Sequence, residues 1–314
     1  SLLKSGKKAL VVGCTGGDTG AAAIKAFNGM ESVTVIVLHP SRGITEEHRR
    51  RLLGAAEENV VNILVEGDYA DCHQLCEKFH RGINETGQQL ISFNSVNWVR
   101  VLAHLSFYFY SSLQLGAPKR EVAFSVPTGN FGALYAGYIA REMGLPIRQL
   151  IVATNTNAGL HNFLQSNLYR RNEIRTTNTP CMNVSLASNF ERLQWSILNR
   201  CSDKVARNME LLETDGQIQL EQDEWLEARK LFDSLAVEDA EAYSCIHEVF
   251  VKSVYLISPN TAIGLRAARI NRRSLLTPMI CLATTHPSSS ASVLAEVAVQ
   301  SPMSVTSAHP FSNE

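Results

Sequence analysis

The sequence predicts an α/β protein made of two successive domains with mainly parallel sheets flanked by helices. Short apolar runs alternate with helical patterns along most of the chain, as parallel strands joined by crossover helices require. With 314 residues, 45% of them hydrophobic, the chain can bury a large core and is long enough for two domains. A glycine-rich loop follows an apolar run in each half. The expected domains are residues 1–115 and 116–314.

The first half carries three strand patterns, each followed by a helical pattern. We expect strands at 9–12, 33–38 and 59–65, and helices at 21–27, 45–53 (with Thr45 as N-cap) and 69–83. A long helix at 96–115 closes this half before Gly116-Ala117-Pro118. The residues before Ala9 lack an initiating Met and resemble the last turn of a helix with Gly6 as its C-cap. We therefore expect further sequence upstream.

The second half begins with an apolar run at 121–125 and a further strand at 149–153. The region 157–242 is more polar and mostly helical, with one helix expected at 223–235. A final strand at 279–282 leads into the segment 283–287, and the tail after Ser301 has little pattern. This order of elements fits a second α/β domain.

The stretch from Val126 to Ala133 joins a strand to a helix and contains two glycines. Such a junction directs backbone N–H groups and the positive end of a helix dipole at one point, where an anion binds well. Gly129 and Gly132 allow the main chain to approach the anion, and Asn130 adds a side-chain donor. The alternative is a tight turn that only starts a helix.

Charge and cysteine content exclude several classes of partner. The 29 basic and 30 acidic residues nearly balance, which gives no reason to expect nucleic acid or an anionic membrane surface. The chain shows no apolar run of membrane-spanning length, and no signal peptide is visible at the start of the given sequence. Seven scattered cysteines indicate free thiols in a reducing compartment. The cytoplasm is the expected location, although an organelle matrix fits equally.

Two other constellations point to structure rather than to chemistry. Cys72 and Cys76 flank His73, but with Leu75 and Phe79 they form the stripe of a helical core face, so we favour packing over a metal site. His286 before Pro287 is catalytic or, more commonly, a turn histidine with a satisfied hydrogen bond. The first glycine-rich loop matches neither a dinucleotide nor a Walker pattern.

Two glycine-rich anion loops imply ligands with two separate anionic groups. A phosphorylated cofactor together with an amino-acid carboxylate or a substrate phosphate fits this arrangement. In the first loop, the carboxylate of Asp18 disfavours direct contact with phosphate, whereas the hydroxyls of Thr15 and Thr19 are suitable donors.

Seven ordered motifs, spanning about residues 9–287, resemble those of threonine synthase, a fold type II pyridoxal phosphate enzyme. The first, Thr15-Gly16-Gly17-Asp18-Thr19-Gly20-Ala21-Ala22, resembles the family's Thr-Ser-Gly-Asp-Thr-Gly-Ser/Ala-Ala loop. Asn94 to Arg100 is similar to Asn-Ser-Ile-Asn-x-x-Arg, and Val126 to Gly132 to Val-Pro-Ser-Gly-Asn-Phe-Gly. The others are residues 153–157, 188–192, 259–262 and 284–287.

The resemblance implies a role for each matching position. The cofactor is pyridoxal 5′-phosphate, with its phosphate on Gly129, Asn130, Phe131 and Gly132 and its pyridine nitrogen on Thr284. The loop that meets the substrate comprises Thr15, Gly17, Asp18 and Thr19. Further candidates for the cofactor hydroxyl or the substrate phosphate are Asn94, Asn97 and Arg100, for which structural capping is an equal alternative.

The resemblance also implies a reaction, the conversion of O-phospho-L-homoserine to L-threonine and phosphate by γ-elimination and β-addition of water. The family's Schiff-base lysine lies upstream of the first loop in a segment that nothing here matches. Further departures are Gly16 for Ser, Ala133 for Asp, Asn260 for His, and Ser288 to Ser290 for Ala-Lys-Phe. The alternative is a non-catalytic or phospho-elimination-only paralogue. The expected partner is a phosphorylated amino acid, and the chain is expected to be a monomer or homodimer.

Overall fold

The computed structural model describes residues 8–15, 17–42, 44, 46–54, 58–67, 69–84, 89–291 and 294–295. The chain divides into two compact units, residues 1–97 and 98–314. The expected domain boundary after residue 115 lies one helix further along the chain. The expectations for Gly6, Thr45, Gly16 and the tail after Ser301 fall outside the described residues.

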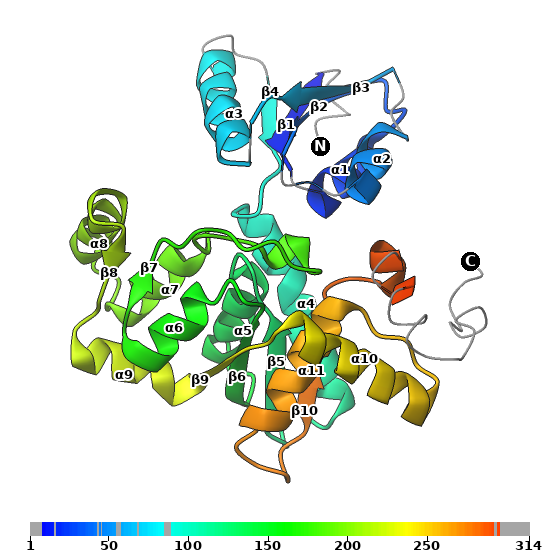
Figure 1. The fold of residues 1–314 in the computed structure, drawn as a ribbon. Helices are drawn as coiled ribbons and strands as arrows, with labels where there is room; N and C mark the ends of the chain where they lie inside the picture. The colour runs from blue at the N-terminus through cyan, green and yellow to red at the C-terminus, as the bar shows by residue number, and fades with distance from the viewer. Residues whose placement is uncertain are drawn as a thin grey trace. The chain divides into compact units, whose positions relative to one another are not determined.

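The first unit is a four-stranded parallel sheet in the order β3-β2-β1-β4. Its strands are β1 (Ala9–Cys14), β2 (Val33–Pro40), β3 (Val60–Val65) and β4 (Gln89–Ser92). Its helices are α1 (Asp18–Phe27), α2 (Glu46–Leu53) and α3 (Tyr69–Asn84). Figure 1 shows α3 on one side of this sheet and α1 with α2 on the other.

Alternation along β1 explains why both faces of this sheet are covered. Val11 packs with Ile24 of α1 and Leu52 of α2, whereas its neighbour Val12 packs with the α3 residues on the opposite face. The two faces of β1 are therefore covered by different crossover helices.

The α3 cysteines lie in the core, as the sequence stripe predicts. Cys72 and Cys76 are buried against β1 and β2, and Phe79 packs beside them. Leu75, which the stripe included, is instead exposed. A hydrogen bond with Cys14, together with burial, raises the pKa of the Cys76 thiol. The two cysteines thus pack as the apolar face of α3 against the sheet.

The second unit contains a parallel sheet in the order β10-β5-β6-β9. Its strands are β5 (Val122–Pro127), β6 (Ile147–Thr154), β9 (Phe232–Ala236) and β10 (Met279–Cys281), with a separate antiparallel pair β7 (Tyr169–Arg170) and β8 (Gln217–Ile218). Its helices are α4 (Trp98–Gln114), α5 (Gly132–Glu142), α6 (Gly159–Ser166), α7 (Phe190–Ile197), α8 (Ser202–Thr214), α9 (Gln222–Leu231), α10 (Asp239–Ser253) and α11 (Pro259–Asn271), with 3₁₀ turns η2 (Pro180–Met182) and η3 (Pro287–Ser290).

The two faces of this sheet are covered by different helices. Phe124, Val126 and Val152 face a large core built with α4 to α9. Ile151 and Ala153 face a smaller core formed with α10 and α11. In Figure 1, α10 and α11 lie together on the side away from α6 and α9. The observed architecture agrees with the predicted α/β fold.

The helix predicted at 223–235 is wrong at its end. Helix α9 stops at Leu231 and the chain passes directly into strand β9, which contains Leu235. Phe232 already has extended backbone, with φ −98° and ψ 133°. Pairing with β6 replaces the helical hydrogen bonds, because Val152 lies opposite Ser234 in the parallel ladder.

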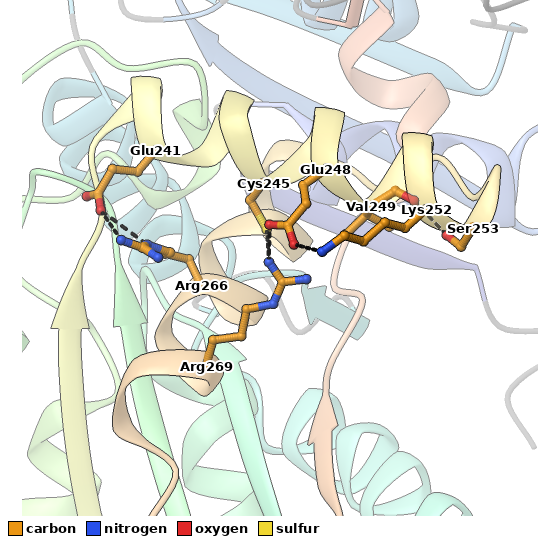
Figure 2. Close-up of polar contacts among 8 residues, drawn as sticks. All are labelled: Glu241, Cys245, Glu248, Val249, Lys252, Ser253, Arg266 and Arg269. Atoms are coloured by element: carbon orange, nitrogen blue, oxygen red, sulfur yellow. Dashed lines mark hydrogen bonds and ion pairs between the residues drawn. The ribbon is translucent and has the colours of Figure 1, made fainter.

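A ladder of ion pairs joins α10 to α11 (Figure 2). Glu241 accepts from Arg266 at 3.2 Å, and Glu248 accepts from Arg269 at 2.7 Å and from Lys252 at 2.6 Å. These partly exposed ion pairs link the two helices outside their buried core.

Helix α11 begins at a side-chain cap. Ser258 accepts the Thr261 N–H at 3.2 Å, and Pro259 occupies the first helical position.

Helix α4 packs against α5 through one buried tyrosine. The Tyr108 hydroxyl donates to the Ala133 carbonyl at 2.7 Å, and its ring lies against Gly137, where a side chain would collide. Burial raises the pKa of Tyr108, so the phenol stays a neutral donor. The hydrogen bond from the buried Tyr108 therefore fixes the first turn of α5 to helix α4.

Candidate functional site

Each sheet has a point where its crossovers leave in opposite directions. In the first unit the chain runs from β1 to β2 on one side and later returns to β4 on the other side of β1. In the second unit β5 lies in the same way between β6 and β10. Ligands of α/β proteins bind beyond the carboxyl ends of the strands at such points. The predicted site residues Thr15, Asn94, Gly129 and Thr284 follow β1, β4, β5 and β10.

The loop after β5 has the conformation of a helix start with exposed donors. Phe131 lies in the left-handed region, with φ 68° and ψ −4°, and Gly132 begins α5. The Asn130 side chain accepts the Gly132 N–H at 2.9 Å. Among the described residues, none accepts a hydrogen bond from the N–H groups of Gly129, Asn130 or Phe131. Three main-chain donors therefore remain available beside the positive end of the α5 dipole.

Gly129 is enclosed by the protein's own main chain. A Cβ at this position would lie 2.8 Å from the Cys181 carbonyl oxygen and 3.0 Å from Met182 Cα. Glycine is therefore required here by the close approach of segment 180–182. The Cys181 thiol in turn accepts from the Asn260 side chain at 3.0 Å, which links this wall to the start of α11.

These features fit a phosphate group such as that of pyridoxal phosphate. Successive free N–H groups at a helix N-terminus are the usual ligands of a phosphate in a protein. Thr128 and Phe131 of this stretch are buried, which anchors the loop in the protein core. The residues present after β5 can hold the phosphate of the expected cofactor.

The segment after β10 lies next to this loop in the same sheet. Cys281 pairs with Ser125, and the Leu282 N–H donates to the Ser125 carbonyl at 3.0 Å. Thr284 follows three residues after the end of the strand and is exposed. The two sets of predicted cofactor residues therefore stand at neighbouring strand ends.

The residues after Thr284 are held by local contacts. The Thr285 hydroxyl donates to Ser258 at 3.0 Å. The His286 Nδ1 atom lies 2.7 Å from the Ser288 hydroxyl and accepts the Ser288 N–H at 3.2 Å. The histidine thus starts the η3 turn, which agrees with the structural interpretation of His286.

In the first unit the loop after β1 satisfies much of its own donor capacity. Thr15 is buried, and its hydroxyl oxygen accepts the N–H groups of Gly17 and Gly20, both at 3.0 Å. Gly17 precedes α1, and Asp18 and Thr19 are its first two residues. The Thr15 hydroxyl therefore shapes the helix start.

Asn94 and Asn97 follow β4, the parallel neighbour of β1. Asn94 accepts the Val96 N–H at 3.0 Å and donates to the Ser92 hydroxyl at 3.0 Å, while Asn97 donates to the Ser92 carbonyl at 3.0 Å. These contacts match the capping alternative. Arg100 lies in the first turn of α4, in the second unit.

Two further motifs of the sequence form polar clusters near the carboxyl edge of the sheet. Asn155 is buried after β6 and donates to Thr177, Thr179 and Asn183 at 2.8–3.0 Å. Asn189, fully buried before α7, donates to the Asn130 carbonyl. Buried polar side chains of this kind need hydrogen-bond partners, and here the partners are other residues of the same edge.

The lysines described in the second unit do not follow strand ends. Lys119 lies before β5, and Lys204, Lys230 and Lys252 pair with Glu224, Glu227 and Glu248. In the first unit Lys8 and Lys25 are exposed.

Within the described ranges, no cluster of three or more His, Cys, Asp or Glu side chains could hold a metal ion. In the same ranges no helix has both the length and the apolar character needed to cross a membrane.

Comparison with known proteins agrees with this geometry. A family model described as "Pyridoxal-phosphate dependent enzyme" matches residues 1–214. Threonine synthase from Pseudomonas aeruginosa is 44% identical over 287 residues, covering 91% of this chain and 61% of the relative. Threonine synthase from Saccharomyces cerevisiae is 34% identical over 303 residues, covering 90% and 59%. The chain thus spans about 60% of the length of these curated relatives.

A solved structure supports the same assignment. The pyridoxal-phosphate-bound threonine synthase from Brucella melitensis superposes with a TM-score of 0.86 at 35% identity, covering 94% of this chain and 64% of that chain. The predicted resemblance to threonine synthase and the predicted fold type II architecture are confirmed. The chain belongs to the family of pyridoxal-phosphate dependent enzymes, whose cofactor is pyridoxal 5′-phosphate.

Proposed function

We propose that this chain carries the cofactor-phosphate loop and the substrate loop of a threonine synthase-like lyase. The reaction is the conversion of O-phospho-L-homoserine to L-threonine and phosphate, by γ-elimination and β-addition of water. The observation that carries the proposal is the loop after β5, whose three free N–H groups stand at the start of α5. Identity of 44% to a threonine synthase supports the choice of reaction.

On the cofactor side, the N–H groups of Gly129, Asn130 and Phe131 donate to the phosphate, and Gly132 starts the helix whose dipole attracts it. The Thr284 hydroxyl hydrogen-bonds the pyridine nitrogen. When bound, pyridoxal phosphate withdraws electrons from the α-carbon of an attached amino acid. A neutral hydroxyl at the nitrogen leaves the ring less protonated than a carboxylate would, which suits elimination.

On the substrate side, Thr15 and Gly17 set the shape of the loop, and Asp18 and Thr19 begin α1. The N-terminal end of α1 then attracts an anionic group of the amino acid. Asn94 and Asn97 shape the chain after β4. Arg100 supplies a positive charge for the substrate phosphate.

A non-catalytic relative is the second candidate, favoured by one observation. The departures at Ala133, Asn260 and Ser288 to Ser290 replace the ionisable Asp, His and Lys of the family motifs with side chains that do not ionise. In this case the chain keeps a phosphate or amino-acid site without turnover.

The test is product analysis with the full-length protein, loaded with pyridoxal phosphate. Equimolar phosphate and L-threonine from O-phospho-L-homoserine would support the proposal. Phosphate from O-phospho-L-threonine without threonine synthesis would support the phospho-elimination alternative. Bound cofactor with neither product would support the non-catalytic relative. Borohydride reduction followed by peptide mapping would identify the lysine that carries the cofactor.

A further inference from the structure

Asn189 is a fully buried polar residue. Its backbone N–H and its side-chain amide both donate to the carbonyl oxygen of Asn130 in the cofactor loop. Its backbone N–H donates to the Asn130 carbonyl oxygen at 3.0 Å, and its side-chain Nδ2 donates to the same oxygen at 3.1 Å. The Nδ2 atom also lies 3.2 Å from where a Cβ of Gly132 would be. The residue before α7 therefore fixes the loop that precedes α5.

Arg192, three residues further along, fixes the orientation of that side-chain amide. Its Nε donates to the Asn189 Oδ1 atom at 3.1 Å, and its guanidinium lies 5.3 Å from the centre of the Trp98 ring. An arginine has no acceptor, so it selects the oxygen of the amide and leaves the NH₂ group facing Asn130. The cation–π contact with Trp98 holds the guanidinium in place.

The clamp on the Asn130 carbonyl determines where the next N–H points. In a trans peptide the C=O of one residue and the N–H of the next are coplanar and point in opposite directions. The Asn130 carbonyl points at Asn189, so the Phe131 N–H points away from α7. This N–H has no acceptor among the described residues, and Phe131 lies in the left-handed region with φ 68° and ψ −4°.

We propose that Asn189 and Arg192 are positioning residues for the cofactor: together they hold the Asn130–Phe131 peptide so that the Phe131 N–H faces the phosphate. This inference rests on the proposed function of the loop after β5. Neither side chain touches the phosphate, and each acts only through the direction of one main-chain donor.

The test compares the affinities of the full-length protein for pyridoxal phosphate and for pyridoxal, which lacks the phosphate. We expect Arg192→Ala and Asn189→Asp to weaken binding of pyridoxal phosphate by about tenfold, the effect of one lost charge-assisted hydrogen bond. Binding of pyridoxal should not change. Arg192→Lys keeps the contact with Trp98 but not the fixed Nε donor, so an intermediate loss is expected.

Arg170 provides a matched control. Its Nε donates to the Asn172 Oδ1 atom at 3.0 Å, an exposed pair of the same geometry in the same unit. Arg170→Ala should leave both affinities unchanged. Unaltered affinity for pyridoxal phosphate in the Arg192 variants would overturn the inference, and so would an equal loss for both ligands. Equal affinity of the unsubstituted protein for the two ligands would instead overturn the assignment of the phosphate loop.

Should Asn189→Asp fail to fold, the two Arg192 variants still decide the question.

Discussion

The loops after β1 and β5 occupy equivalent places in their sheets but differ in their donors. In the first unit, the buried Thr15 hydroxyl accepts two N–H groups of the helix start, from Gly17 and Gly20. In the second unit, the side chain of Asn130 accepts the Gly132 N–H, and among the described residues the three preceding N–H groups have no acceptor. In the same strand-loop-helix arrangement, the loop's own side chain accepts main-chain N–H groups in the first unit, whereas main-chain N–H groups remain without an acceptor in the second.

This difference sets how many main-chain donors each loop can offer to an anion. Glycine content alone does not, because both loops are glycine-rich. Binding capacity depends on whether a side chain of the loop already occupies the N–H groups. In the second unit the burial of Phe131 and the external clamp of Asn189 keep the donors free. We therefore expect substitutions in the two loops to have different consequences.

The largest effect is expected from Gly129→Ala in the loop after β5. The new methyl group would contact the Cys181 carbonyl oxygen at 2.8 Å, so the loop or segment 180–182 must move. Loss of one or more phosphate contacts should weaken pyridoxal phosphate binding by about 10- to 100-fold, since each charge-assisted bond is worth roughly 1.5–3 kcal/mol. Equilibrium titration of the full-length protein measures this. Some loss of stability should accompany it.

Gly159→Ala is the control for that substitution. Its Cβ would meet Tyr169 at 3.7 Å, an ordinary contact, at the start of α6. Cofactor affinity should be unaffected. If both variants bind the cofactor normally, the open-loop description of residues 129–132 is wrong.

The next effect is a loss of stability from Thr15→Val. This change leaves the Gly17 and Gly20 N–H groups without their buried acceptor, at a cost of about 1–3 kcal/mol in the free energy of unfolding. Asn130→Ala removes the matching acceptor in the second unit, where one partly buried N–H is affected. It should cost less. Denaturant unfolding measures the free energy of unfolding of both variants. A larger decrease for Asn130→Ala than for Thr15→Val would contradict the difference between the two loops.

A smaller, pH-dependent effect is expected at the end of β2, next to β1. Burial and the nearby Arg49 lower the pKa of His39, whose Nδ1 atom has no partner in the described part of the chain. The unfolded chain then binds the proton more readily, so stability is complete above the ordinary pKa and falls as pH decreases below it. His39→Gln should reduce this slope between pH 7 and 5. An unchanged slope would assign the pH dependence to other groups.

The smallest effect is expected away from both loops, at Glu248. Its ion pairs with Arg269 and Lys252 are largely exposed, and salt and solvent weaken such pairs. Glu248→Gln should leave the thermal midpoint within experimental scatter, and cofactor affinity unchanged. A clear loss of stability would show that the α10–α11 ladder contributes more than its exposure indicates.

Much of the fold follows from local pattern, and the errors have physical causes. The alternation of apolar runs and helical stripes predicted β1 to β3, β5, β6 and β10, because buried parallel strands are short and apolar. The end of α9 was misjudged because Leu231 and Leu235 are four residues apart and no Gly or Pro separates helix from strand. The helical spacing of apolar residues thus continues past Leu231 into β9. Only the pairing of β9 with β6 shows where the helix ends.

The candidate site was predictable to a similar degree. The strand-loop-helix junction at 126–133 is present, and its assignment to the cofactor phosphate stays a prediction. The roles of Asn189 and Arg192 could not be derived from sequence, because they depend on the contact between Asn189 and Asn130, which lie 59 residues apart. The sequence also does not show that the Thr15 hydroxyl accepts N–H groups of its own loop. Nor does it show that the main-chain N–H groups after β5 lack an acceptor among the described residues.

The bond from Tyr108 to the Ala133 carbonyl has an evolutionary consequence. It anchors the first turn of α5 through a main-chain atom, so the anchor does not depend on which side chain residue 133 carries. The family motif has an aspartate at this position, and this chain has an alanine. Selection could therefore alter the reactivity beside the cofactor loop without changing how α4 and α5 pack.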